Sequence, residues 1–134
     1  LTILPRLALD EYYRQYENVD IALDTPPYGG GTTTFDALWM GVPVLTLAGD
    51  RSASRSAASI LGALGLHAWI AATAQDYVRL ALAHAGDSEG LGALRATLRQ
   101  RLQRSPLMDE ARFARDVEAA YREMWRSWCG RRIT

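Results

Sequence analysis

Short apolar runs alternate with segments of helical spacing along the first half of the chain. Strands are predicted for the apolar runs at Thr2–Leu4, Ile21–Leu23, Val44–Leu47 and Leu66–Ala71. Helices are predicted between them, at Asp10–Tyr16 with Asp10 as the N-cap, at Thr34–Met40 and at Ser52–Leu64. This alternation predicts an α/β fold, in which a parallel sheet with right-handed crossovers is covered by helices on both faces.

The second half of the chain is predicted to be helical. One helix starts at Thr73 or Ala74, another runs from Asp87-Ser88 to a break at Ser105-Pro106, and the last starts at Asp109. The last helix carries large apolar residues at helical spacing, which are Phe113, Val117, Tyr121, Met124, Trp125 and Trp128. We expect Trp125 and Trp128 to pack in the core or against another domain.

The stretch Asp20–Leu47 contains the most specific pattern: a strand, a glycine-rich loop, a helix and a second strand. Pro26-Pro27 ends the first strand, because proline lacks the N–H that a central strand needs. The three glycines that follow allow positive φ and the close approach of a ligand, and they are Gly29, Gly30 and Gly31. Gly41 is placed to end the helix.

The start of this helix is a predicted anion site. A helix N-terminus leaves N–H groups unpaired and carries a partial positive charge, so a phosphate or a diphosphate is its natural ligand. The hydroxyl groups of Thr32, Thr33 and Thr34 add donors, and Asp36 can accept hydrogen bonds from a sugar hydroxyl. The motif is neither a Walker A sequence, because no lysine follows the glycines, nor GxGxxG.

A purely structural interpretation of the same residues stays open. Thr33 and Asp36 match a capping box, in which Thr33 is the N-cap and Asp36 reaches back to it. Arg55, in the first turn of the predicted Ser52–Leu64 helix, can pair with a phosphate or a carboxylate, or it can lie in solvent. His67 is interpreted as a packed or surface residue rather than a catalytic one, and His84 as a surface residue near the end of its helix.

The motif LDTPPYGGGTTTFDALWMGVPVLTL, followed by ASRSAAS at 53–59, resembles the donor-binding half of the O-linked N-acetylglucosamine transferases. It is similar also to their SPINDLY-type relatives and to bacterial proteins with tetratricopeptide repeats, loosely as far as Tyr121–Trp125. The resemblance implies a Rossmann-like domain that is the C-terminal half of a GT-B fold. It also implies a nucleotide-sugar donor, here expected to be a UDP-sugar, no required metal, and transfer of N-acetylglucosamine to protein Ser or Thr.

The resemblance assigns roles to individual residues. In the animal enzymes the two threonines after the glycine loop contact the donor diphosphate, which implies Thr32 and Thr33 here. The next aspartate contacts the ribose, which implies Asp36. The expected donor-binding set is Gly29, Gly30, Gly31, Thr32, Thr33, Thr34, Asp36, Tyr12 and Arg55.

The chain departs from the family pattern at three positions. Gly31 stands where the family often has a histidine, and Leu9 and Tyr12 stand where animal enzymes have a lysine and a histidine that serve the nucleotide. Tyr12 can stack on a base, hydrogen-bond to it, or simply pack. Uracil and guanine therefore both remain open as the base of the donor.

Composition narrows the functional classes. Fifteen acidic residues balance fifteen arginines, with no lysine, so nothing favours nucleic acid or an anionic membrane as a partner. The missing lysine excludes a catalytic or phosphate-binding lysine in this segment.

Cys129 is the single cysteine, which excludes an internal disulfide, and no ligand cluster surrounds it. Without a signal-peptide pattern or a long apolar span, the cytoplasm is the expected location.

The length of 134 residues predicts a single domain, 1–134. Because the sequence begins inside a predicted strand, we interpret it as a piece of a longer protein. The resemblance implies that it is the C-terminal part, preceded by an N-terminal catalytic domain and possible tetratricopeptide repeats. Its expected partners are a nucleotide sugar and a protein acceptor. Two alternatives remain: an inactive nucleotide-sugar-binding module, and an interaction domain that uses the stripe of the last helix.

Overall fold

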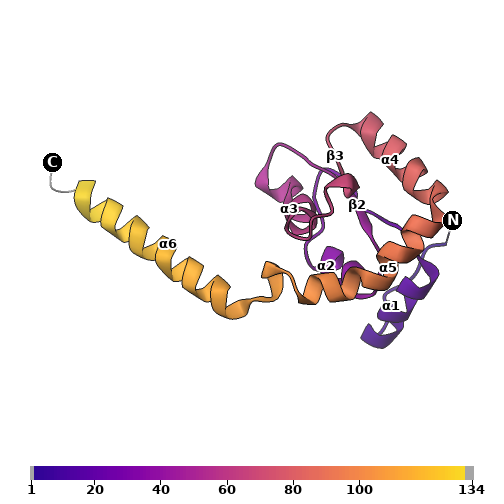
Figure 1. The fold of residues 1–134 in the computed structure, drawn as a ribbon, viewed down its shortest axis with the longest axis horizontal. Helices are drawn as coiled ribbons and strands as arrows, with labels where there is room; N and C mark the ends of the chain where they lie inside the picture. The colour runs from indigo at the N-terminus through magenta and orange to yellow at the C-terminus, as the bar shows by residue number, and fades with distance from the viewer. Residues whose placement is uncertain (1, 132–134) are drawn as a thin grey trace.

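A three-stranded parallel sheet lies at the centre of the domain in the computed structural model, which describes residues 2–131 (Figure 1). Its strands are β1 (Ala22–Leu23), β2 (Val44–Leu47) and β3 (Ile70–Ala71), in the order β1-β2-β3. Ala22 pairs with Val44, and Thr46 pairs with Ile70. The chain passes through a helix between successive strands, so the predicted alternation is confirmed.

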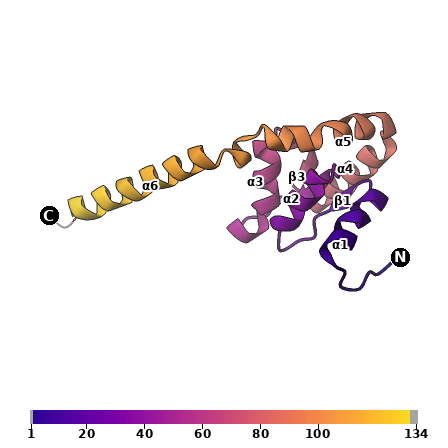
Figure 2. The ribbon, with the colours of Figure 1, turned by 90° about the horizontal axis from the view of Figure 1, so that it is seen from below.

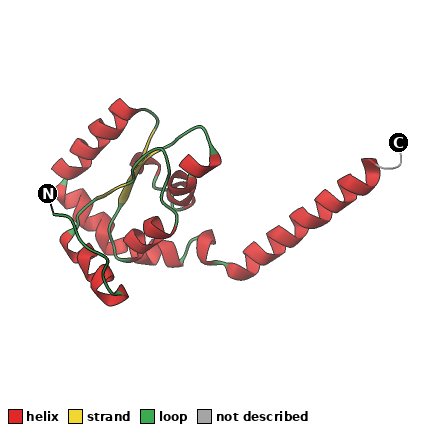
Figure 3. Cartoon of the chain, turned by 180° about the vertical axis from the view of Figure 1, so that it is seen from behind, coloured by secondary structure: helices red, strands yellow, loops and turns green. Residues whose placement is uncertain are grey.

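The middle strand is covered on both faces. Val44, Leu45 and Thr46 are successive residues of β2 and expose 3%, 0% and 0% of their surface. Because neighbouring side chains in a strand point to opposite faces, burial of all three requires cover on both sides. The strands lie enclosed by helices in Figure 3, as the apolar pattern predicts.

The helices are α1 (Leu9–Gln15), α2 (Thr32–Trp39), α3 (Ser56–Ala63), α4 (Ala74–Gly86), α5 (Ser88–Gln103) and α6 (Glu110–Arg131). Short 3-10 turns occupy Tyr16–Asn18, Ser52–Ser54, His67–Trp69 and Pro106–Met108. The starts predicted for α4 and α5 are confirmed, because Thr73 accepts a hydrogen bond from the Asp76 N–H and Asp87 accepts one from the Gly90 N–H. Gly41 ends α2 with a φ of 77°, which favours glycine.

The core joins the sheet to helices from both halves of the chain. Leu45 of β2, Leu61 of α3 and Leu98 of α5 are all completely buried within one apolar cluster. α5 packs against α2 and α4 (Figure 2). Residues 88–103, although distant in sequence from the glycine loop, therefore support the helix that the loop precedes.

Two of the predicted strands were wrong in whole or in part. Residues 2–8 form no regular structure, and Ile3 and Leu4 expose 84% and 49% of their surface, because no strand in the described chain pairs with them. The predicted strand Leu66–Ala71 is shortened to β3, since His67–Trp69 forms a 3-10 turn. The described residues therefore contain three strands instead of four.

Several helix starts also differ from the predictions. Ala8, not Asp10, is the N-cap of α1, and Asp10 instead pairs with Arg14 at 3.5 Å. α2 begins two residues earlier than predicted, at Thr32. The predicted helix Ser52–Leu64 is divided into a 3-10 turn and α3, which begins at Ser56.

The last helix, α6, extends away from the rest of the molecule (Figures 1 and 2). Trp125 and Trp128 expose 64% and 51% of their surface, so they do not pack in the core of this domain. The alternative, packing against another domain, stays a prediction. The apolar stripe forms as predicted, but no described element covers it. None of the described helices has the length and apolar character needed to cross a lipid bilayer.

Candidate functional site

Asp24, the residue directly after β1, holds the loop that leads to α2. Its Oδ1 accepts a hydrogen bond from the Gly30 N–H (2.8 Å), and its Oδ2 accepts one from Thr46 Oγ1 (2.6 Å). Tyr77 on α4 donates its hydroxyl to the Asp24 carbonyl oxygen (2.9 Å). Asp24 is not among the donor-binding residues that the sequence predicts.

The three glycines of the loop differ in their surroundings. Gly29 is buried and donates its N–H to the Ala53 carbonyl oxygen (3.0 Å), which joins this loop to the segment before α3. A Cβ at Gly30 would lie 2.6 Å from Thr34 Oγ1, while a Cβ at Gly31 would meet open space. None of the three has a positive φ, so that expectation was wrong. Glycine is required at position 30 for close packing, whereas position 31 has room for a side chain.

The N-terminus of α2 presents the predicted hydrogen-bond donors. The first helical bond runs from the Phe35 N–H to the Gly31 carbonyl oxygen (3.1 Å), so the N–H groups of Thr32, Thr33 and Thr34 have no partner within the helix. The side chains of Thr32 and Thr33 are exposed, whereas Thr34 is buried. An anion at this position can therefore meet three backbone N–H groups and two threonine hydroxyls.

Asp36 faces α1 rather than the start of its own helix. Its Oδ1 accepts a hydrogen bond from the Tyr13 hydroxyl (3.0 Å), and its Oδ2 accepts one from the Tyr12 hydroxyl (3.2 Å). The capping-box interpretation was wrong, because Gly31 is the N-cap and no side chain caps the helix. The structure thus brings together two predicted site residues, Tyr12 and Asp36, and adds Tyr13, which is not in the predicted donor-binding set.

The tyrosines of this network contact one another. The hydroxyls of Tyr12 and Tyr16 lie 2.7 Å apart, and the ring of Tyr12 meets those of Tyr13 and Tyr16 edge-on, with centroids 5.3 and 5.4 Å apart. Burial, followed by the hydrogen bond to Tyr16, raises the pKa of Tyr12 well above its usual range. The hydrogen bond to Asp36 likewise raises the pKa of Tyr13. Both hydroxyls therefore keep their protons at neutral pH and remain available as donors.

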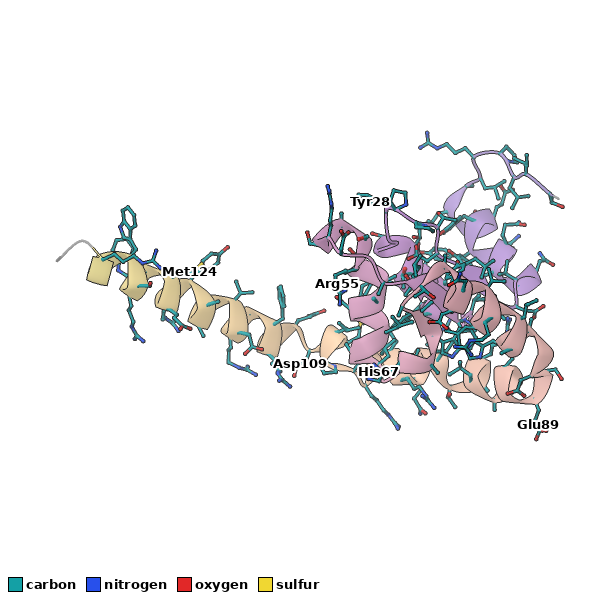
Figure 4. The ribbon with its side chains drawn as sticks, turned by 90° about the horizontal axis from the view of Figure 1, so that it is seen from above. Tyr28, Arg55, His67, Glu89, Asp109 and Met124 are labelled. Carbon is teal, nitrogen blue, oxygen red and sulfur yellow. The ribbon has the colours of Figure 1, made fainter. Side chains whose placement is uncertain are left out.

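Arg55 lies at the start of α3, in the same part of the molecule as the loop residue Tyr28 (Figure 4). Its Nη1 donates a hydrogen bond to the Gly49 carbonyl oxygen (2.9 Å), while the side chain as a whole stays exposed. His67 follows the other end of α3 and is exposed (Figure 4). His84 stacks on Trp69 with ring centroids 3.8 Å apart. His67 therefore has the predicted surface position, whereas His84, predicted to be a surface residue, is half-buried against Trp69.

A cavity of about 420 Å³ lies beside the glycine loop, where the three strands end. Its walls include Asp24 and Gly29 after β1, residues 47–51 around the end of β2, and residues 72–74 after β3. In open parallel sheets, ligands bind at the carboxyl ends of the strands. The glycine loop, the start of α2 and this cavity together are typical of nucleotide-binding domains with a Rossmann-like α/β fold.

Comparison with known families identifies the family within that class. The model of Glycosyl transferase family 41 matches residues 3–117. The chain therefore belongs to glycosyl transferase family 41.

Curated relatives and a solved structure agree with this assignment. The chain is 43% identical over 128 residues to the probable UDP-N-acetylglucosamine–peptide N-acetylglucosaminyltransferase SPINDLY of Eustoma exaltatum subsp. russellianum, covering 95% of this chain. It is 36% identical over 121 residues to the UDP-N-acetylglucosamine–peptide N-acetylglucosaminyltransferase of Caenorhabditis elegans, covering 90% of this chain. A mutant of the Thermobaculum terrenum O-GlcNAc transferase superposes with a TM-score of 0.82 at 40% identity, over 96% of this chain.

The match covers only a small part of each relative. The chain spans 14% of the Eustoma protein, 10% of the nematode protein and 24% of the bacterial chain. The fold is therefore that of the corresponding part of a GT-B glycosyltransferase, and the Rossmann-like prediction is confirmed.

Proposed function

We propose that this chain is the donor-binding part of a glycosyltransferase that transfers N-acetylglucosamine from a UDP-sugar to Ser or Thr of proteins. The observation that carries the proposal is the N-terminus of α2, where exposed Thr32 and Thr33 flank unpaired N–H groups. The names of the relatives, which specify UDP-N-acetylglucosamine and a peptide, support the identity of the donor and the acceptor.

The proposed chemistry is electrostatic. When the sugar leaves, negative charge builds up on the nucleotide diphosphate. The N–H groups at the start of α2 and the hydroxyls of Thr32 and Thr33 are already oriented and can stabilise this charge without rearranging. Asp36 would accept hydrogen bonds from the ribose. The exposed guanidinium of Arg55, which donates one hydrogen bond to the Gly49 carbonyl oxygen, would donate another to the diphosphate.

We propose further that donor binding needs no divalent metal. Within residues 2–131, no three His, Cys, Asp or Glu side chains are grouped so that they could hold a metal ion. The charge of the diphosphate would instead be met by the helix N-terminus. Nucleotide affinity should therefore be the same in EDTA as in magnesium, and loss of binding in EDTA that magnesium or manganese restores would contradict this.

Calorimetric titration of the longest native form of the protein with UDP, GDP and UDP-N-acetylglucosamine tests the donor site. The double substitution Thr32→Ala/Thr33→Ala removes two hydrogen bonds to a charged group, which are worth at most about 3–6 kcal/mol together. Thr97→Ala on α5 is the matched control, because Thr97 bonds only to carbonyl oxygens of its own helix. A folded double variant with unchanged affinity would refute the site.

The exposed stripe of α6 supports a second function, in which the domain contacts another protein surface. Phe113, Tyr121 and Trp125 expose more than half of their surface on one face of this helix. An exposed apolar patch of this kind is typical of interaction sites. If the chain binds no nucleotide but α6 captures a protein partner, the interaction function is the correct one.

A further inference from the structure

The carboxylate of Asp36 is held from a different element of the fold. Tyr13 and Tyr12, both on α1, donate to its Oδ1 and Oδ2 at 3.0 and 3.2 Å. The two contacts bridge 23 and 24 residues of sequence, so they depend on how α1 packs against α2. Each carboxylate oxygen therefore has one fixed donor, and the plane of the carboxylate is fixed by two contacts rather than one.

The Asp36 carboxylate keeps lone-pair sites that the tyrosines do not use. An ionised carboxylate has about four lone-pair sites, two on each oxygen. One site on Oδ1 and one on Oδ2 are used by the tyrosines, so each oxygen keeps one site for a ligand. Two adjacent hydroxyl groups, as in the 2′,3′-diol of a ribose, match a carboxylate that presents one free site on each oxygen.

Contacts among the tyrosines also hold the ring of Tyr12 in place. Tyr16 contacts the Tyr12 hydroxyl at 2.7 Å, and the ring of Tyr12 packs edge-on against the rings of both Tyr13 and Tyr16, which limits the rotation of Tyr12. Asp36 itself is only partly buried, so a ligand can reach it. A carboxylate with fixed orientation loses less conformational entropy when a ligand binds than a freely rotating one does.

We propose that Tyr13, assisted by Tyr12, is a positioning residue that orients the Asp36 carboxylate to accept both hydroxyls of the donor ribose. This inference rests on the proposed donor site. It assigns to α1 a role in recognising the sugar of the nucleotide that is separate from binding of the diphosphate by α2.

The test compares ligands with and without the ribose diol. The longest native form of the protein is titrated with UDP and GDP, and the nucleotide that binds more tightly is then compared with its 2′,3′-dideoxy analogue. We expect Asp36→Asn to remove most of the preference for the diol. Tyr13→Phe should weaken the ribonucleotide about three- to tenfold, the range of one hydrogen bond, and leave the dideoxy analogue unchanged.

Two further variants control the experiment. Tyr121→Phe, an exposed tyrosine on α6, makes the same chemical change far from the loop and should alter neither affinity. Tyr12→Phe removes the longer of the two contacts and should show the same selective loss to a smaller degree, which keeps the test available if Tyr13→Phe does not fold. Thermal unfolding of each variant establishes that it is folded.

The outcomes separate this inference from the function on which it rests. If Asp36→Asn removes the diol preference but neither tyrosine variant alters it, the positioning role is overturned and the donor site stands. Equal weakening of both ligands by Tyr13→Phe would show a structural role only and would also overturn it. If the unmodified chain binds neither UDP nor GDP, the proposed function itself fails.

Discussion

The two long helices of the C-terminal half, α5 and α6, have similar apolar patterns and opposite environments. Leu98 and Leu102 of α5 are buried to 0% and 1% exposure, whereas Phe113 and Met124 of α6 expose 69% and 56%. α5 lies against α2 and α4, while α6 extends away from them (Figure 2). Helical spacing therefore predicts which face of a helix is apolar, but the arrangement of the other elements determines whether that face is covered.

The largest expected effect concerns sugar transfer, which this chain by itself should not catalyse. Residues 2–131 contain a single sheet, whose strand ends border the cavity, and no second domain lies opposite it within these residues. Sugar transfer needs an acceptor hydroxyl that is held in line with the sugar carbon. Positioning of that kind supplies roughly 7–11 kcal/mol of the barrier. We expect the purified 134-residue chain to transfer no sugar from UDP- or GDP-sugars to a mixed peptide library. Turnover that Asp36→Ala abolishes would show that this chain carries a complete active site.

The second prediction compares equivalent truncations in α5 and α6. Leu98→Ala removes a fully buried side chain and should lower the free energy of unfolding by about 2–5 kcal/mol. Met124→Ala removes an exposed side chain of similar size and should lower it by less than about 0.5 kcal/mol. Urea denaturation measures both. Equal costs would mean that α6 is covered in solution.

The third prediction concerns the anchor of the loop. Asp24→Ala leaves the buried hydroxyl of Thr46 without its acceptor, which should cost about 1–3 kcal/mol of stability. Adding Thr46→Val removes the unpaired hydroxyl and should recover part of this loss. Nucleotide affinity should stay reduced in the double variant, because the Gly30 N–H still lacks its partner. Full recovery of affinity would show that Asp24 stabilises the fold without shaping the loop.

The fourth prediction concerns association through α6. The exposed stripe should cause the chain to self-associate. Phe113→Glu/Met124→Glu should raise the dissociation constant at least about tenfold, which corresponds to roughly 1.4 kcal/mol. Ala119→Glu is the matched control, since helical spacing places residue 119 on the opposite side of α6. Sedimentation velocity distinguishes these cases, and equal effects of both charge changes would exclude the stripe as the contact.

The smallest expected effect is a dependence on pH. Folding raises the pKa of Tyr12 and Tyr16, chiefly through burial, and that of Tyr13, chiefly through its hydrogen bond to Asp36. A raised tyrosine pKa contributes stability that is present below the usual value of about 10 and is lost as the pH rises above it. Unfolding free energy should therefore fall above pH 10. Tyr12→Phe should flatten this fall, and an unchanged slope would contradict the effect.

Much of the region from β1 to β2 was predictable from the sequence. β2 has the predicted bounds, Gly41 ends α2 as predicted, and α2 follows the glycines, although it begins at Thr32 rather than at Thr34. These features depend on residues that are close in sequence, such as a proline that ends a strand or a glycine that ends a helix. The expected strand at Thr2–Leu4 failed for the opposite reason, because a strand needs a partner that no local pattern specifies.

By itself, then, the sequence determined the alternation of strands and helices, the family, and the presence of a helix after the glycine loop, though not its start at Thr32. Only the tertiary structure decided that Asp24 anchors the loop through Thr46, that Tyr13 holds Asp36, and that the apolar face of α6 stays exposed. The first two are contacts between residues 22 and 23 positions apart, and the third concerns a well-formed helix face that no other element of residues 2–131 covers. Propensity and spacing act over a few residues, whereas these features depend on which elements meet in space.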